Sequence, residues 1–262
     1  MVRTRTERLL VTKFGADGGQ RQPDDLIVEE PMTIQLDGTV VSTTMRTPGH
    51  DFELAAGFCF TEGLLDGAAV SGVRYCANGS ALASEFNDVT VETGGRAPAP
   101  RPRLGTTSSS CGWCGNDQID ELLARLEPLP SGHAIDPSVL AAVPRTVLDG
   151  QGLYATTGAV HAAAAFDADG TVTLTREDVG RHNAVDKVVG ALLLAGALPA
   201  TGRGLFVSGR ASVEMVQKAW AAGFGSLVAV SAPTSLAVRA ARRAGLRLVG
   251  FAREDRYNVY TD

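Results

Sequence analysis

Cysteine is scarce in this chain. Its 262 residues include only four cysteines, which are Cys59, Cys76, Cys111 and Cys114. Small domains held together by disulfides use far more, so this count excludes a disulfide framework and favours a reducing compartment. We therefore expect the close pair Cys111 and Cys114 to serve chemistry rather than to cross-link the fold.

Long apolar segments are also absent. The longest uncharged apolar stretch covers residues 188 to 198, well short of the roughly 20 residues that a membrane-spanning helix needs. The opening sequence MVRTRTERLLVTKF carries several charges, which leaves no apolar core for a signal peptide. We expect a cytoplasmic protein without a membrane partner.

Lysine is nearly missing. It occurs at Lys13, Lys187 and Lys218, so most of the 24 basic residues are arginines. The net charge of -5 argues against a general nucleic-acid-binding protein. The planar guanidinium of arginine favours discrete contacts with phosphate or carboxylate groups. A compositional bias of the source genome would raise the arginine content too, and we attribute the larger part of the excess to it.

The first part of the chain combines strands with a helix. Residues 1–24 are polar and glycine-rich, which predicts a loose N-terminal arm or an edge strand. Within residues 25–93, two strand-like segments flank Asp37-Gly38, a typical hairpin turn. A helix capped near Thr47 follows, and then the short strand candidates VRYCA and NDVTVET. This part is expected to form a small α+β unit.

The composition changes at residue 94. Residues 94–115 are rich in glycine, proline, arginine and serine and end in SSSCGWCG, which predicts an exposed, mobile loop that carries the cysteine pair. A helix is expected from Asp117 onward. Through the rest of residues 116–262, short apolar strands alternate with helical segments, the pattern of βαβ units with a helix-covered sheet. The C-terminal half is therefore predicted to be an α/β domain.

The CxxC pair admits several functions. A structural zinc site needs four ligands, and no second close pair of cysteine or histidine residues supplies the other two. A thioredoxin-like dithiol normally follows a strand directly, whereas this pair follows a long loop. Because a helix N-terminus lowers the pKa of a thiol, a mobile loop with two thiols also suits a carrier of a transferred group. The residues alone favour a carrier and leave the other two functions open.

Polar residues follow several predicted strands of the C-terminal half. Ligand groups in α/β folds gather where strands end and helices begin, which makes these residues candidates for anion binding. The alternative is a capped helix with solvated charges. His161 begins a strand of four alanines, and we interpret it as a packed core residue. The candidates are Arg181, His182 and Asn183 in REDVGRHNAVDK, Ser208 and Arg210 in VSGRASVEM, and Phe251, Arg253 and Arg256 in FAREDRYNVYT.

Seven segments in order along the chain resemble the FdhD family of sulfur carrier proteins required for formate dehydrogenase activity. They are TMRTPGHDFELAAGFCFTEGL, SSSCGWCG, TTGAVHAAAAFDADG, REDVGRHNAVDK, VSGRASVEMVQKA, SAPTSLAV and FAREDRYNVYT. The resemblance implies a sulfurtransferase that receives a persulfide from a cysteine desulfurase and passes the sulfur to the molybdenum of a bis(molybdopterin guanine dinucleotide) cofactor. It also implies a homodimer and a three-layer core similar to cytidine deaminases, with no permanently bound metal.

The resemblance assigns roles to individual residues. Cys111 maps to the persulfide-bearing cysteine and Cys114 to its helper. The cofactor-binding stretch maps to Phe251, Ala252, Arg253, Glu254, Asp255 and Arg256. This chain departs from the family by having Ala159 and Glu254-Asp255 where glycine is common, and the added acids would weaken phosphate binding if they faced the ligand.

Three other activities can be compared with sulfur transfer. Deamination is disfavoured because zinc deaminases use an H-x-E motif, whereas this chain has His161-Ala162-Ala163. A cofactor-binding protein without sulfur chemistry and a dithiol oxidoreductase remain as alternatives.

Overall fold

The computed structural model describes residues 4–16, 18–76, 80–82, 84–100, 126–130, 135–253 and 256–262. Cys111 and Cys114, Glu254 and Asp255, and nearly all of the helix expected from Asp117 lie outside these ranges.

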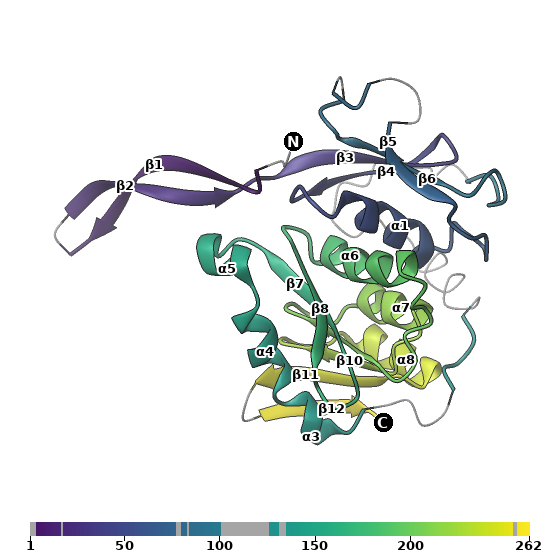
Figure 1. Cartoon of the computed structure of the whole chain (residues 1–262). Coiled ribbons are helices and arrows are strands. Elements are labelled where there is room, and N and C mark those ends of the chain that lie inside the picture. The colour runs from purple at the N-terminus through teal and green to yellow at the C-terminus, as the bar shows by residue number, and fades with distance from the viewer. Residues whose placement is uncertain are drawn as a thin grey trace.

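A six-stranded mixed sheet forms the centre of the C-terminal half (Figure 1). Its order is β12-β11-β10-β9-β7-β8. Strands β9, β10 and β11 run parallel, β7 is antiparallel to both of its neighbours, and β12 is antiparallel to β11. The strands are β7 (His161–Phe166), β8 (Val172–Asp178), β9 (Gly204–Val207), β10 (Ser226–Ala229), β11 (Arg247–Arg253) and β12 (Arg256–Thr261). The predicted α/β class is confirmed.

Helices cover both faces of this sheet. One face packs against α6 (Arg181–Leu194), α7 (Val213–Ala221) and α8 (Ser235–Ala244), and the other against α3 (Pro137–Leu140) and α4 (Val143–Asp149). Successive side chains of a strand point to opposite faces. Accordingly, Ala163 and Ala165 of β7 join the first core, while Ala162, Ala164 and Phe166 join the second. The short helix α5 (Gly152–Thr157) follows α4.

The N-terminal part contains a four-stranded sheet and one helix. The sheet order is β4-β3-β6-β5, and Asp37 and Gly38 turn the β3–β4 hairpin with φ of 46° and 84°, as the sequence predicts. Helix α1 (Asp51–Thr61) starts later than its predicted cap at Thr47. The Thr47 hydroxyl is buried and accepts from the Val179 N–H at 3.0 Å, and His50 occupies the N-cap position. The strands are β3 (Glu30–Leu36), β4 (Thr39–Arg46), β5 (Gly72–Tyr75) and β6 (Asp88–Glu92).

Helix α1 lies between the N-terminal sheet and α6 (Figure 1). The two helices cross at a pair of glycines. A Cβ on Gly57 would lie 1.9 Å from the carbonyl oxygen of Asp186, and one on Gly190 would lie 1.8 Å from that of Glu53. Because real Cβ atoms do not approach backbone so closely, only glycine permits this crossing.

Buried ion pairs join the same two parts. Lys187 Nζ lies 2.7 Å from Asp178 Oδ2 and donates to the Thr47 carbonyl at 2.9 Å. Lys218 Nζ lies 2.8 Å from Asp186 Oδ1 and 3.2 Å from Glu62 Oε1 at the end of α1. Buried charges are stable only when paired and hydrogen-bonded, so these lysines fix the N-terminal part to the helices of the C-terminal half.

The first strands form a separate feature. Residues 6–27 make a two-stranded antiparallel ribbon of β1 (Thr6–Gly15) and β2 (Gly18–Ile27), which Figure 1 shows projecting from the rest of the molecule. Of the two predictions for residues 1–24, the strand is therefore the one that the structure shows, with both strands present and paired along ten residues each.

Candidate functional site

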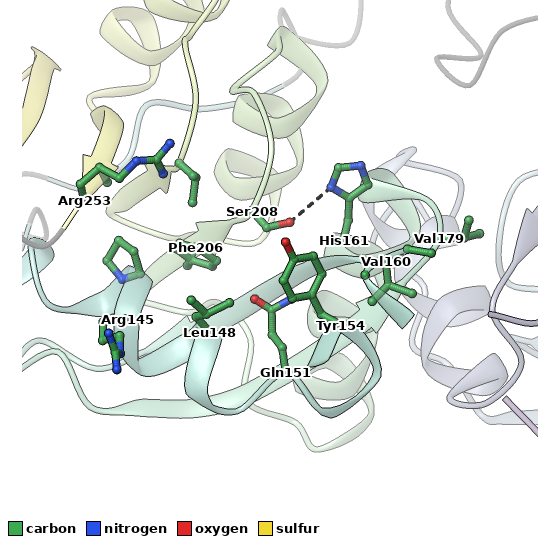
Figure 2. A pocket seen from close by; sticks show the side chains of 15 residues that line it. Arg145, Leu148, Gln151, Tyr154, Val160, His161, Val179, Phe206, Ser208 and Arg253 are labelled. Atoms are coloured by element: carbon green, nitrogen blue, oxygen red, sulfur yellow. Dashed lines mark hydrogen bonds between the residues drawn. The ribbon is translucent and has the colours of Figure 1, made fainter. Parts of the chain in front are cut away.

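A cavity of about 650 Å³ opens where the parallel strands end. Ser208 follows β9, Val230 follows β10, and Ala252 and Arg253 end β11. Helices α4 and α5 form the opposite wall (Figure 2). The carboxyl ends of parallel strands are the usual ligand-binding edge of α/β sheets, and the volume lies in the range of small-molecule sites.

Ser208 and His161 meet at one side of the cavity (Figure 2). The Ser208 hydroxyl oxygen accepts from the Ala162 backbone N–H at 2.9 Å and lies 3.3 Å from His161 Nδ1. Burial and the nearby charges of Arg181 and His182 lower the pKa of His161, while Asp178 opposes them. In the tautomer with the proton on Nε2, the neutral ring accepts a hydrogen bond from the Ser208 hydroxyl at Nδ1 and presents the Nε2–H to a ligand.

Tyr154 and Gln151 come from the turn around α5. The carboxylate of Glu177 in β8 accepts from the N–H groups of Leu153 and Tyr154 at 3.0 and 2.8 Å. Satisfying these first amides of α5 fixes the helix against the sheet edge. Tyr154 is 43% exposed and lines the cavity with Gln151, so an aromatic face and an amide both stand at its wall.

The lining combines apolar and basic groups. Phe206, Val160 and Leu148 supply apolar surface, and Arg145 and Arg253 supply guanidinium groups (Figure 2). Arg145 also pairs with Asp149 at 3.1 Å. Such a lining suits a ligand with a flat ring and an anionic group, because aromatic and apolar surfaces bind the ring and arginine binds the anion.

A second hollow of about 400 Å³ adjoins the end of β11. It is lined by Phe251, Arg253, Arg256, Tyr257 and Asn258. Arg253 lines both hollows, and Phe251 is 45% exposed with a φ of 52°. Four of the six residues predicted in this stretch, Phe251, Ala252, Arg253 and Arg256, therefore lie at one of the two hollows, while Glu254 and Asp255 are outside the described residues.

The three residues predicted at the start of α6, Arg181, His182 and Asn183, lie in different environments. Arg181 lies near His161: both side chains lie 3.7 Å from the position of a Cβ on Gly209, and burial and the charge of Arg181 together lower the pKa of His161. His182 Nε2 is 3.9 Å from Glu214 Oε2; burial raises the pKa of Glu214, but contacts with His182 and Ser212 outweigh it and lower that pKa to about 2. Arg181 and His182 are not among the residues that line the cavity, but, together with burial, their charges lower the pKa of His161 at its wall.

Asn183 makes hydrogen bonds within the fold. Its side-chain amide donates to the Met45 carbonyl at 2.8 Å and to Asp178 Oδ1 at 3.0 Å, and the residue is buried. Arg210 is exposed and is not among the residues that line the cavity. Neither residue contributes to the cavity as it stands.

Several residues that line the cavity cannot be predicted from the sequence. Arg145, Leu148 and Tyr154 lie on short helices with no clear apolar period, and Gln151 is the residue before α5, so nothing in the sequence pattern marks them. The sequence suggests a packed core residue at His161, but the structure places it half-buried at the cavity wall. His161 begins β7 and Ser208 directly follows the neighbouring strand β9, and this position at a strand end is the signal that could have identified His161.

The two cysteines within the described ranges are not available for chemistry. Cys59 and Cys76 are unpaired and buried. Burial, with the charges of Asp186 and Glu62, raises the pKa of Cys59 to about 12, so this thiol stays protonated and unreactive.

Within the described ranges, no group of three or more His, Cys, Asp or Glu side chains is placed to hold a metal ion. None of the helices in the same ranges reaches the length and apolarity that crossing a bilayer requires.

Comparison with known proteins gives concordant matches over nearly the whole chain. The FdhD/NarQ family model matches residues 27–262. A sulfur carrier protein FdhD from Mycolicibacterium paratuberculosis is 45% identical over 98% of this chain and 97% of its own length, and one from Nocardia farcinica is 45% identical over 98% and 93%. The crystal structure of a candidate formate dehydrogenase accessory protein from Desulfotalea psychrophila superposes with a TM-score of 0.77 at 25% identity, covering 99% of this chain and 98% of that one.

Proposed function

Because the chain belongs to the FdhD/NarQ family, we propose that it is a sulfurtransferase that carries sulfur from a cysteine desulfurase to the molybdenum cofactor of a formate dehydrogenase. The observation that carries the proposal is its 45% identity, over nearly full length, to proteins named as sulfur carriers. The cofactor is the bis(molybdopterin guanine dinucleotide) form, which this protein binds as a substrate. The transfer takes place in the cytoplasm.

The sulfur is held on Cys111. Its thiolate attacks the outer sulfur of the desulfurase persulfide, the donor's S–S bond breaks, and the donor cysteine leaves as a thiolate. The product is a persulfide on Cys111, and no external oxidant is consumed. Cys114 assists release of the sulfur. The buried state of Cys59 and Cys76 supports the choice of the CxxC pair.

The cofactor binds with a guanine nucleotide end in the cavity beside Ser208 and Arg253. Support comes from the cavity volume of about 650 Å³, the aromatic ring of Tyr154 and the two arginines of its lining. A guanine ring can stack on Tyr154 and accept or donate hydrogen bonds at Gln151, while arginine binds phosphate. The cavity is too small for the whole cofactor, so the remainder extends outside it. The protein acts as a homodimer with a core similar to cytidine deaminases.

A persulfide-mapping experiment tests the sulfur chemistry. The protein is incubated with a cysteine desulfurase and cysteine, and its cysteine peptides are analysed by mass spectrometry without reduction. We expect a one-sulfur mass increment on the peptide containing residues 108–115 and none on the peptide of Cys59. The Cys111→Ala variant should lose both the increment and the ability to mature formate dehydrogenase.

The controls separate the alternatives. Cys59→Ala is the matched cysteine variant and should keep both activities. A protein that only binds the cofactor would bind GDP and mature the dehydrogenase without Cys111 and Cys114. A dithiol oxidoreductase would form a reversible Cys111–Cys114 disulfide and reduce insulin. An unlabelled 108–115 peptide together with an active Cys111→Ala variant would refute sulfur carriage.

A further inference from the structure

The β1–β2 ribbon leaves both of its strand edges open. The two strands form a sheet of their own, with no third strand among the described residues. Its base is held by the Val28 N–H, which donates to the Arg5 carbonyl at 2.9 Å, and β2 packs against α5. Beyond this base the ribbon projects into solvent (Figure 1). An isolated two-stranded ribbon is marginally stable in water, so this one gains from a further partner.

The ribbon exposes apolar side chains on both faces. Leu10 is 64% and Phe14 84% exposed on one face, and Leu9 is 43% and Leu26 40% exposed on the other. Ion pairs between the strands, Arg8 with Asp25 at 2.8 Å and Lys13 with Asp24 at 2.7 Å, neutralise much of its charge. The ribbon therefore exposes apolar side chains, and its charges are balanced. It has no excess of one sign that would attract an oppositely charged protein.

The two open edges differ. Strand β2 contains Pro23, which lacks an N–H group and interrupts an edge. Strand β1 has no proline through its ten residues, TERLLVTKFG. Long edges without proline or inward-facing charge readily pair with another strand. The β1 edge is therefore the more suitable of the two for strand addition.

We propose that the β1 edge pairs with the β1 edge of a second copy of this chain, forming a four-stranded antiparallel sheet across a twofold axis at Leu10. Antiparallel pairing of identical strands has twofold symmetry, so one surface contacts its own copy. In this register, the residue numbers of each opposed pair add up to 20. The pairs are Leu10 with Leu10 of the partner subunit, Leu9 with the partner's Val11, Arg8 with the partner's Thr12, Glu7 with the partner's Lys13, and Thr6 with the partner's Phe14.

Charge complementarity selects this register. It brings Glu7 opposite the partner's Lys13 twice, once on each side of the axis, and cross-strand pairs of opposite charge stabilise a sheet. Registers centred on Leu9 or on Val11 keep each side chain on its face, but they place Glu7 opposite Val11 or Gly15 instead. A pairing centred on Leu10 therefore joins apolar residues at the axis with opposite charges at the flanks. It gives the proposed homodimer a location, which does not depend on the sulfur chemistry.

Sedimentation velocity over a concentration series tests the interface on the full-length protein. Leu10→Lys places two like charges against each other at the axis, so we expect the dimer dissociation constant to rise about tenfold or more. Leu82→Lys is the matched control, because it makes the same change at a leucine that is 72% exposed on the loop between β5 and β6, outside the ribbon. That variant should dimerise like the wild type. A dimer that survives Leu10→Lys unchanged would place the interface elsewhere.

A charge exchange gives a second test that does not depend on the apolar residues. Glu7→Lys and Lys13→Glu should each weaken the dimer, because each puts like charges opposite one another. Mixing the two variants should restore it, since both flanking pairs of the mixed dimer join lysine to glutamate. A wild-type protein that remains a monomer at all concentrations, or variants that fail to associate better when mixed, would overturn the proposal. Either result would leave the persulfide test unaffected.

Discussion

Arg253 is the side chain that the two hollows share. It is exposed at the end of β11 and lines both of them, so a phosphate bound at their junction would contact its guanidinium group. We predict that Arg253→Ala raises the dissociation constant for GDP about three- to tenfold, the range expected for one solvent-accessible charged contact. Isothermal titration calorimetry measures this directly. Arg203→Ala, which removes an arginine paired with Asp167 before β9, should leave GDP affinity unchanged.

His161 should make stability depend on pH. Burial and the charge of Arg181 lower the pKa of His161 below its ordinary value of 6.5. The unfolded chain therefore binds a proton more readily than the native protein, and the free energy of unfolding falls as the pH drops below about 6.5. The loss is complete below the native pKa. Urea denaturation between pH 7.5 and 5 should show a smaller decline for His161→Gln than for the wild type, and equal declines would contradict the assignment.

Sequence patterns identify some of the site and miss the rest for a physical reason. Ser208 and Arg253 at the cavity can be predicted, because each lies where a strand ends and the ends of parallel strands meet at one edge. Tyr154 cannot be predicted, because its position depends on Glu177 in a distant strand. Asn183 has the same polar character as a ligand residue, yet Asp178 and Met45 use its amide. A pattern shows which groups are polar but not which groups the fold has already paired.

The crossing of α1 and α6 depends on Gly57 and Gly190. Because a Cβ at either position would overlap the backbone of the other helix, Gly57→Ala must push the helices apart and disturb the ion pairs beside them. We predict a loss of at least about 2 kcal/mol in the free energy of unfolding, measured by urea denaturation.

Gly152→Ala is a suitable control for this substitution. Gly152 begins α5, and a Cβ there meets no atom within 4 Å. Its replacement should be neutral or slightly stabilising, since alanine favours helix more than glycine does. Equal effects of the two substitutions would mean that the helix crossing tolerates a wider separation.

The sequence predicts the presence of individual helices and strands better than it predicts what packs against them. The helix at 51–61 and the strands of the C-terminal half follow from apolar spacing and turn residues. The covering of α1 on two sides cannot be predicted in this way. A glycine within a helix indicates only a lower helix propensity, and nothing in the local sequence reveals that a second helix packs against it. The ribbon is a similar case, since its strands cover no core and therefore show no alternation of apolar and polar residues.

The molecule should unfold as one unit although it has separate sheets. Lys187, Lys218 and the bidentate pair of Arg176 with Glu53, at 2.5 and 2.8 Å, join the N-terminal part to the C-terminal half. We predict one transition in urea, with hydrogen exchange in β3 and β10 protected to the same free energy. Two separate transitions would show that the halves are independent.

A substitution at the junction sharpens this test. Lys218→Ala leaves Asp186 and Glu62 without their buried partner, which costs about 3–5 kcal/mol. If the halves unfold together, protection in β3 and in β10 should fall by the same amount. A decrease confined to one sheet would contradict a single cooperative unit.

The burial of Lys187 and Lys218 has a practical consequence for labelling. Their side chains are 0% and 3% exposed, whereas that of Lys13 on the ribbon is 48% exposed. Among the lysines, amine-reactive reagents will therefore modify Lys13 in preference to Lys187 and Lys218. A fluorophore or cross-linker attached by this chemistry reports on the ribbon, and coupling through amines to a sensor surface would obstruct it. Binding studies of the cavity are better carried out with the protein attached through another group.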